Sequence, residues 1–174
     1  MDQEEPIITN HINKEFSNGD SYHGEVKNMK KEGKGLYTFN NGDTYEGDFI
    51  NGLFDGEGIY TYANINAKYE GEYKEGKKCG HGTYYFANGN VFEGEFENGE
   101  MKNGIFYFPN EEKYEGDLIN GKFEGKGKYY YNNGDVYDGE WANDHKNGHG
   151  KYILNDGSEI EGEWKDDFPV KEDK

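Results

Sequence analysis

A five-residue segment recurs along the chain at intervals of 22 to 24 residues, and this period limits the possible folds more than any other feature. The copies read YHGEV, YEGDF, YEGEY, FEGEF, YEGDL, YDGEW and IEGEW and start at residues 22, 45, 69, 92, 114, 137 and 160. A repeat of this length is typical of an array of small units that bury their apolar faces against one another. The period therefore predicts a repeat protein.

Each copy contains two segments with the alternation of a β-strand. In the start, positions 1, 3 and 5 share one strand face, as Tyr69, Gly71 and Tyr73 do, while the acidic positions 2 and 4 face the other way. Most starts are followed by a Gly-x-Gly, then by an aromatic segment such as TYYF, and then by NNG, ANG or NDG. Asn-Gly pairs fit turns that need positive φ. We predict two short strands per copy, with the Gly-x-Gly in a turn. We also expect a ring from a neighbouring strand to lie on the glycine of the start.

The Tyr-x-Gly-x-aromatic start and the Gly-x-Gly spacing resemble the MORN (membrane occupation and recognition nexus) repeat family. The resemblance implies an all-β fold, in which tandem β-hairpins form a single-layer twisted antiparallel sheet and a rod-like array. On this basis we divide the chain into an acidic leader (1–11), a partial N-terminal repeat (12–21), six repeats (22–159), a partial C-terminal repeat or cap (160–168) and a polar tail (169–174).

Several copies depart from the pattern. The second copy ends in ANINAK, with one extra residue, and the fourth is one residue short and lacks the first glycine of its Gly-x-Gly. Met29 and Asp144 stand where other copies have a turn glycine. These departures argue against the regular turn at those positions.

The charge of the chain excludes some classes of partner. The formal net charge is −17, and all 19 basic residues are lysine. We therefore expect no nucleic-acid binding, which depends on neutralising phosphates. One lysine cluster, formed by Lys27, Lys30, Lys31 and Lys34, is a possible contact for anionic lipid, but the acidic whole predicts weak or no direct lipid binding. A single Cys and the lack of a long apolar run indicate a cytoplasmic protein.

The sharper chemical sites that short motifs suggest do not fit the sequence. No stretch has the spacing of a phosphate-binding P-loop, and Cys79 with His81 lacks the paired ligands of a zinc site. NNGDVYDGEWAND has acids, but not in the order of a calcium loop. Acidic pairs such as Glu93 and Glu95 recur in six of the seven copies, which a catalytic pair would not do. We expect no catalytic residue, metal or cofactor, and an acidic stripe facing solvent.

These features favour a non-enzymatic scaffold that binds a protein partner along an aromatic and acidic sheet surface. The family resemblance adds the cytoskeleton or a membrane-associated structure as a setting. We expect the middle copies to hold the partner through Tyr69, Tyr73, Tyr84, Phe86, Phe92, Phe96, Phe106 and Phe108, although these rings could instead fill the packed side of the sheet. The alternatives are a phospholipid-binding membrane tether and a regulatory repeat piece of a larger enzyme assembly.

The C-terminal copies concentrate large apolar side chains at the end of the array. The last start, IEGEW, has no recognisable second strand. Large apolar groups at an array end need a cap or a partner. We therefore predict a homodimer through these copies, with Phe168 folding back over Trp164 as the alternative, and the residues concerned are Trp141, Ile160, Trp164 and Phe168.

Overall fold

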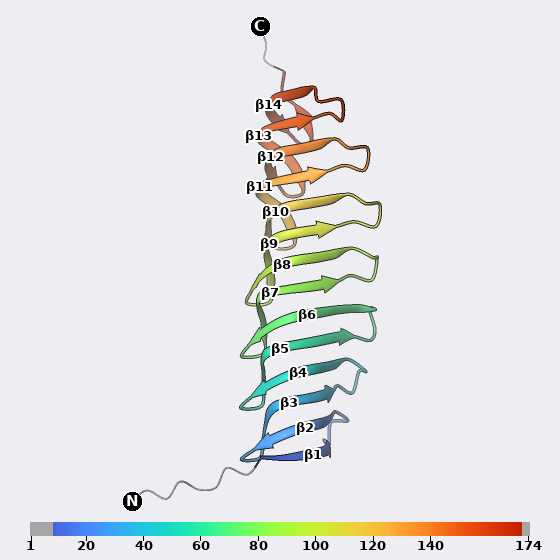
Figure 1. Ribbon diagram of the computed structural model, residues 1–174, viewed down its shortest axis with the longest axis vertical. Helices are drawn as coiled ribbons and strands as arrows, with labels where there is room; N and C mark the ends of the chain where they lie inside the picture. The colour runs from blue at the N-terminus through green and yellow to red at the C-terminus, as the bar shows by residue number, and fades with distance from the viewer. Residues whose placement is uncertain (1–8, 172–174) are drawn as a thin grey trace, which may run out of the picture. The chain divides into compact units, whose positions relative to one another are not determined.

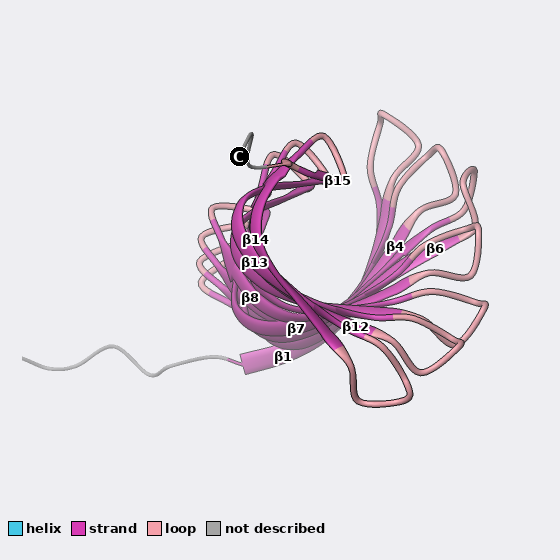
Figure 2. Ribbon diagram, turned by 90° about the horizontal axis from the view of Figure 1, so that it is seen from above, coloured by secondary structure: helices cyan, strands magenta, loops and turns pink. Residues whose placement is uncertain are grey.

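The computed structural model describes residues 9–171, which form fifteen β-strands and no helix (Figures 1 and 2). The strands are β1 (Thr9–Glu15), β2 (Ser21–Lys27), β3 (Lys30–Thr38), β4 (Thr44–Ile50), β5 (Leu53–Tyr62), β6 (Ala67–Lys74), β7 (Lys77–Tyr85), β8 (Val91–Glu97), β9 (Glu100–Tyr107), β10 (Lys113–Ile119), β11 (Lys122–Tyr130), β12 (Val136–Ala142), β13 (His145–Ile153), β14 (Glu159–Lys165) and β15 (Phe168–Pro169). The chain divides into two compact units, Met1–Ala87 and Asn88–Lys174.

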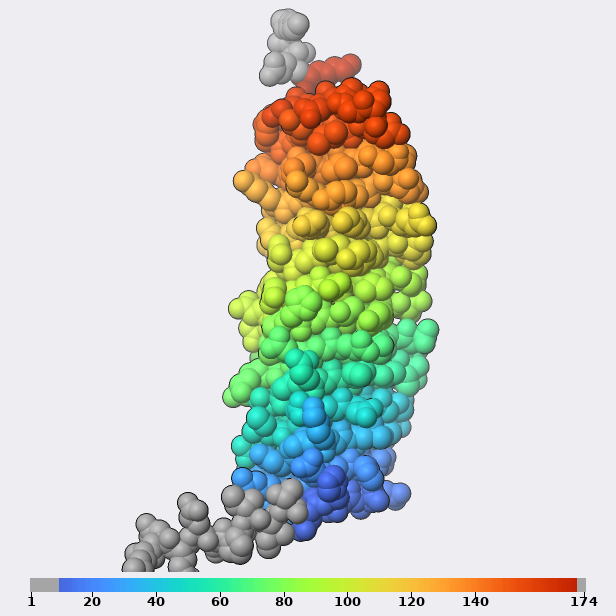
Figure 3. Space-filling model, in the orientation of Figure 1, coloured from blue at the N-terminus to red at the C-terminus, as the bar shows by residue number. Residues whose placement is uncertain are grey.

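Each unit is an antiparallel sheet in which neighbouring strands are consecutive in the chain. Strands β1 to β7 build the first unit and β8 to β15 the second. Within a unit, successive repeats stack as bands along the chain (Figure 3). The predicted all-β class, built from tandem hairpins, is confirmed. Most of the predicted leader (1–11) and part of the predicted tail (169–174) lie outside the described residues.

The two strands of a repeat are joined by a two-residue turn with positive φ at both positions. Asn51 and Gly52 have φ of 53° and 93°. This geometry matches the twist of a hairpin and favours Asn-Gly. The prediction of an irregular turn at Met29 and Asp144 is wrong, because both residues adopt positive φ, of 63° and 71°, in the same kind of turn.

The Gly-x-Gly lies inside a strand, so its predicted place in a turn is also wrong. Gly56 belongs to β5, has a φ of 111° and sits where the β4–β5 register shifts. The bulge places the Glu57 amide 3.1 Å from the Asp48 carboxylate, which accepts its hydrogen bond. A β-bulge places extra residues opposite a partner strand. Its glycine therefore serves the backbone conformation and the acid beside it.

The short fourth copy changes only this bulge. Glu95 pairs with Asn103 and the next residue, Phe96, pairs with Met101, so Lys102 is the one extra residue. In the second copy Gly47 pairs with Gly58 and Phe49 with Phe54, which leaves three residues opposite one. The shorter bulge therefore accommodates the deletion, and the side chains on either side of it keep their faces of the sheet.

The core of each unit is a layer of aromatic rings on one face of the sheet. The Tyr45 ring lies over Gly58 and stacks on Phe54 with centroids 3.7 Å apart. Its hydroxyl donates to the Asp48 carbonyl at 2.9 Å. The ring covers the glycine of its own strand, Gly47, as well as that of the next strand. The expectation of a ring from a neighbouring strand is therefore met at the Gly-x-Gly, while the start glycine is covered by the tyrosine two residues before it.

At four of the long loops, a carboxylate forms hydrogen bonds with the repeat that follows it. Asp43, at the end of one loop, accepts hydrogen bonds from the Tyr60 hydroxyl at 3.1 Å and the Ala63 amide at 2.9 Å, both in the following repeat. The same pair of bonds is made by Asp20, Glu112 and Asp135. We call this arrangement the loop-acid contact. The contact satisfies the carboxylates of Asp20, Asp43 and Asp135, which are buried and would otherwise destabilise the fold.

The end of the second unit differs from the prediction. β14 does have a partner, because Trp164 and Lys165 pair with the two residues of β15. Phe168 does not cover Trp164, since 74% of its surface is exposed. Trp164 is instead buried on the aromatic face, where its indole N–H donates to the Gly150 carbonyl at 3.1 Å.

Candidate functional site

A groove runs across six strands of the first unit, on the face opposite the aromatic core. It has a volume of about 880 Å³ and is lined by residues of β1 to β6. Its floor is a row of cross-strand glycine pairs, which we call the glycine row: Gly24, Gly35, Gly47, Gly58 and Gly71.

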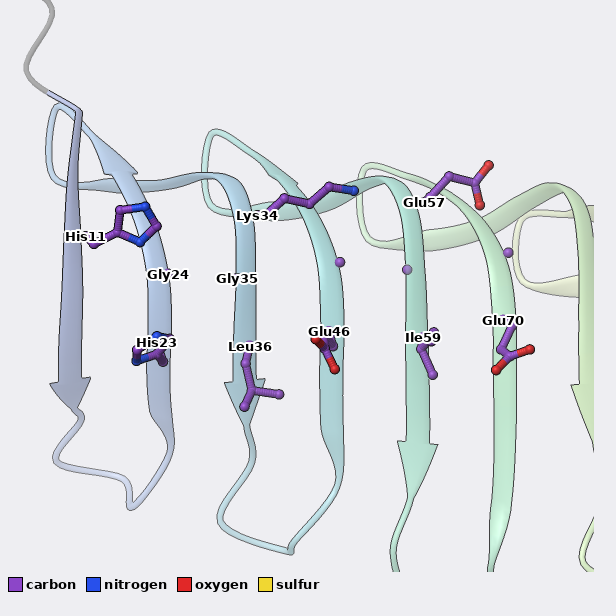
Figure 4. A pocket seen from close by; sticks show the side chains of 13 residues that line it. His11, His23, Gly24, Lys34, Gly35, Leu36, Glu46, Glu57, Ile59 and Glu70 are labelled. Atoms are coloured by element: carbon purple, nitrogen blue, oxygen red, sulfur yellow. The ribbon is translucent and has the colours of Figure 1, made fainter.

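The glycine row explains why the sheet is hollowed there. A Cβ on Gly35 or Gly58 would point to the aromatic face and meet a tyrosine ring at about 2.5 Å. The rings therefore pack directly on bare backbone, and the strands bend close to the row (Figure 4). Side chains on both sides of the row then stand as walls, with Leu36, Glu46, Ile59 and Glu70 along one wall and Lys34 and Glu57 along the other (Figure 4).

The walls combine acidic groups with exposed apolar ones. Leu36 is 37% exposed and Ile59 39% exposed, which is high for large aliphatic side chains. Glu46 and Glu57 make no ion pair within residues 9–171, whereas Glu70 binds Lys68 at 2.6 Å. Lys34 contributes little positive charge to the groove, because its ammonium lies 2.9 Å from the Asp48 carboxylate. The groove is therefore negative and partly apolar.

The second unit has a smaller groove on the matching face. It has a volume of about 490 Å³ and includes Gly139 and Gly150 in its lining. Here the wall charges compensate one another. Lys151 contacts Glu159 at 2.9 Å and Glu161 at 3.4 Å, and the hydrogen bond that its ammonium donates to Glu159 raises the pKa of Lys151. This groove has fewer free charges to offer a ligand.

The eight aromatic residues predicted to bind a partner fall into two groups. Tyr69, Tyr73, Phe92 and Phe96 are buried in the aromatic core of their own unit. Their neighbours Tyr84, Phe86, Phe106 and Phe108 are half-buried and so offer some surface. The binding role of these four remains a prediction, because alternation shows which rings share a face but not which face is packed.

The four lysines considered for lipid contact do not form one surface. Lys31 lies on the aromatic face, with its ammonium 4.1 Å from the centre of the Tyr37 ring. Lys34 lies in the groove on the other face, paired to Asp48. Lys30 is exposed and Lys27 half-buried at the end of the hairpin. A flat membrane could not contact all four together.

The four residues assigned to a dimer or cap also divide by burial. Trp141 and Trp164 are buried, whereas Ile160 and Phe168 are exposed at the end of the second unit.

No three His, Cys, Asp or Glu side chains of residues 9–171 are grouped so that they could hold a metal ion. Over the same residues, no helix is long and apolar enough to cross a membrane.

The sequence matches a known protein family along most of the chain. The MORN repeat model matches residues 22–44, 45–64, 69–91, 92–112, 114–136, 137–159 and 161–170. The chain belongs to the MORN repeat family. No curated protein matches this MORN chain.

The solved structures that are similar to the MORN chain include two domains of the proteins SAS-4 and CPAP, of which the first resembles it in fold. The first is the TCP domain of SAS-4 (dCPAP) of Drosophila melanogaster, in complex with a proline-rich motif of Ana2 (dSTIL). It is 17% identical, with 90% of this chain and 87% of that chain covered and a TM-score of 0.57. The TCP10 domain of Danio rerio CPAP is 12% identical, with 88% and 89% covered and a TM-score of 0.41.

Proposed function

We propose that this MORN protein is a non-enzymatic scaffold that binds an extended, basic segment of a protein partner in the groove of the first unit. The observation that carries the proposal is the groove itself, which combines a bare backbone floor, two free carboxylates and two exposed aliphatic side chains. Aliphatic walls and a few placed charges are what binding sites for protein segments commonly have.

The direction of the groove limits the shape of the bound segment. The groove crosses the strands, whose backbone groups already pair with one another, so a partner cannot bind here as an added strand. Six strands at about 4.8 Å spacing span about 24 Å, the length of roughly seven extended residues. A polyproline II segment fits this requirement, because it is extended and needs no backbone partners. The proline-rich motif bound by the Drosophila TCP domain, a protein of similar fold, gives this choice some support.

The acidic side chains in the two walls of the groove indicate the charge of the partner segment. Glu46 and Glu57 are free to pair with Lys or Arg, and the chain's net charge of −17 attracts a cationic segment from a distance. We therefore propose a partner segment that contains basic residues, proline and at least one apolar side chain for Leu36 and Ile59.

Selection from a random peptide display library tests this function. The full chain should enrich basic, proline-containing peptides, and the double variant Glu46→Gln/Glu57→Gln should lose most of their binding at physiological salt. The matched control is Glu93→Gln/Glu115→Gln, which removes two exposed acids from the second unit and should leave binding unchanged. Selected peptides with no basic enrichment, or with equal affinity for the groove variant, would refute the proposal.

We propose weak or no direct lipid binding, a cytoplasmic location and no catalytic role. The divided lysine cluster supports the first point, since the lysines lie on different faces. Association with the cytoskeleton or with a membrane would then come through the protein partner. Co-sedimentation with phosphoinositide-containing vesicles that is lost on replacing Lys27, Lys30, Lys31 and Lys34 would favour the tether instead. A role as a regulatory piece of a larger enzyme assembly is compatible with the same groove.

A further inference from the structure

On the aromatic face of the first repeat, a lysine is surrounded by aromatic rings and has a carboxylate beside it. The Lys31 ammonium lies 4.1 Å from the centre of the Tyr37 ring, 5.8 Å from that of Tyr22 and 5.9 Å from that of Phe16. Beside it is the loop-acid contact of Asp20, whose carboxylate accepts from the Tyr37 hydroxyl at 2.6 Å and the Asn40 amide at 2.8 Å. Asp20 also offsets part of the lowering that burial imposes on the pKa of Lys31.

The third repeat reproduces the cage of rings. The Lys78 ammonium lies 4.6 Å from the centre of the Tyr84 ring, 4.9 Å from that of Tyr69 and 5.3 Å from that of Tyr62. Tyr84 and Tyr69 hold the positions of Tyr37 and Tyr22 in the first repeat, because Tyr84 pairs with Tyr69 across the hairpin as Tyr37 pairs with Tyr22.

The carboxylate is missing from this second copy of the arrangement. Two residues before the start tyrosine, where the first repeat has Asp20, the third has Ala67. Ala67 is 5% exposed and Asp20 8%, so the two positions are equally buried. An alanine methyl cannot accept a hydrogen bond.

The donors that such a carboxylate would serve are all retained. They are the Tyr84 hydroxyl, the Ala87 amide and the Lys78 ammonium. Tyr84 and Ala87 correspond to Tyr37 and Asn40 in their spacing from the start. Within residues 9–171 neither the hydroxyl nor the amide has a hydrogen-bond acceptor, and Lys78 has no ion pair. Burial without a compensating acid lowers the pKa of Lys78 to about 8.

In the fourth repeat, both the acid and the hydrogen-bond donors that it would serve are absent. There Asn90 holds the acid position, Phe106 replaces the tyrosine and so has no hydroxyl, and Pro109 replaces the residue that supplies the amide. No donor set remains. The third repeat differs, since it has lost the acceptor and kept three donors.

We propose that Lys78, Tyr84 and the Ala87 amide form a binding site for a carboxylate, supplied by an Asp or Glu side chain of a partner protein. The bound carboxylate would take the place that Asp20 holds in the first repeat. The half-buried rings of Tyr62 and Tyr84 give the partner segment an apolar contact beside it. This site goes beyond the proposed function, because it lies on the opposite sheet face from the groove and selects the opposite charge.

The first experiment supplies the carboxylate within the chain. Ala67→Asp should restore the loop-acid contact, so hydrogen exchange of the Ala87 amide should slow by about tenfold and the melting temperature should rise. In a Lys78→Met background the rise in melting temperature should be smaller. Unchanged exchange at Ala87 in a folded Ala67→Asp variant would refute the geometry.

The second experiment uses the wild-type chain and probes added in solution. Acetate, and a hexapeptide with one central Glu, should each shift the Ala87 amide resonance saturably. The Gln version of the peptide, and sodium chloride at equal ionic strength, should not. These shifts should vanish in Ala67→Asp, while the Glu46→Gln/Glu57→Gln variant should keep them, which separates this site from the groove. Absence of a saturable shift with the Glu peptide, including the case in which only acetate binds, would refute a partner-supplied carboxylate.

Discussion

The tyrosine that begins most repeats packs on backbone that carries no side chain. Tyr45 lies within contact of the Gly47 and Gly58 backbone on one side and of the Phe54 ring on the other. Its hydroxyl reaches the Asp48 carbonyl, so the polar end of a buried ring is also satisfied. Flat contact of this kind uses dispersion over the whole ring and requires glycine at both backbone positions.

Replacing one of these glycines should therefore destabilise the fold by overpacking. A Cβ on Gly58 would lie about 2.5 Å from atoms of the Tyr45 ring. We expect Gly58→Ala to lower the free energy of unfolding by about 1–3 kcal/mol, measured by urea denaturation. Gly162 is the matched control, because a Cβ there meets nothing within 4 Å. A Gly162→Ala loss as large as that of Gly58→Ala would show that overlap with the Tyr45 ring does not decide the effect.

Met29 carries backbone strain that a glycine would remove. Its φ of 63° is left-handed and its side chain is 99% exposed, so no packing compensates. We expect Met29→Gly to raise the free energy of unfolding by about 1 kcal/mol. Asp144 has a similar φ of 71°, but its carboxylate accepts from the Phe123 amide at 2.8 Å. Asp144→Gly should therefore bring no gain in thermal or urea denaturation. A gain equal to that of Met29→Gly would contradict this explanation.

Stability should depend on pH in the alkaline range through the caged lysines. The pKa of Lys78 is lowered by burial to about 8 in the folded state, against 10.5 for an ordinary lysine. Above pH 8 the unfolded chain therefore binds more protons, and the free energy of unfolding should rise with pH. Above about pH 10 it should fall, because burial raises the pKa of tyrosines such as Tyr22 to about 12. Urea denaturation at pH 8, 9 and 10 tests this, and Lys78→Met should show a smaller rise. An equal rise in that variant would assign the effect to other groups.

At the scale of the hairpin, two kinds of join hold the repeats together. At the tight turns, a backbone amide reaches back to the previous repeat, as Gly52 does to the Lys31 carbonyl at 2.8 Å. At the long loops, the loop-acid contact joins Asp43 to Tyr60 and Ala63. A repeat that has both joins is therefore linked to its neighbour at both ends of its strands as well as through the sheet, as expected for an array stabilised by nearest neighbours.

Removing a loop acid should expose this dependence. Asp43→Ala leaves the Tyr60 hydroxyl and the Ala63 amide without their acceptor, so we expect a loss of about 1–3 kcal/mol in the free energy of unfolding. The control is Asp156→Ala, because the Asp156 side chain accepts only from the nearby Ser158 on the surface. Equal effects of the two substitutions in urea denaturation would mean that the contact between repeats adds nothing.

Much of this hairpin could be predicted from the sequence. The period of the YEGDF-like starts located the strands, and alternation placed Tyr45 and Phe49 on one face with Glu46 on the other. The bulge could not be predicted, because the spacing of a Gly-x-Gly is the same in a turn and in a strand, and it does not reveal that Asp48 faces three residues. The groove was missed for a related reason: it arises where paired glycines from neighbouring strands align, which requires the register.

At the scale of the whole molecule, the repeats of a MORN array are not interchangeable. The groove in the first unit keeps free acids, while that in the second pairs them with Lys151 and His149. The loop acid that stabilises most joins is absent at Ala67 and at Asn90. Departures from the repeat therefore change charge and hydrogen bonding locally while the strands and their register continue. Such positions are where a repeat protein can acquire a specific partner without loss of its fold.

At the end of the second unit, exposed apolar side chains lie beside a strand edge. Ile160 and Phe168 are exposed, and β15 pairs with β14 only at Trp164 and Lys165, so Glu159 to Glu161 form an open edge in the part of the chain that the structure describes. An open edge with apolar side chains favours pairing with a second strand. We predict that two copies associate through this edge, with two-fold symmetry.

Light scattering on the purified chain tests the dimer. The mass should approach twice 20.0 kDa at high micromolar concentration, and Ile160→Lys should return it to the monomer, because a charge on the edge opposes pairing. Ile160 is the residue to change, since a charge at Trp164 would disrupt the buried indole and its bond to Gly150. The matched control is Ile65→Lys, which alters a similarly exposed isoleucine in a loop of the first unit. A monomer at all concentrations would exclude the dimer, and a dimer that Ile160→Lys leaves intact would place the contact on another surface.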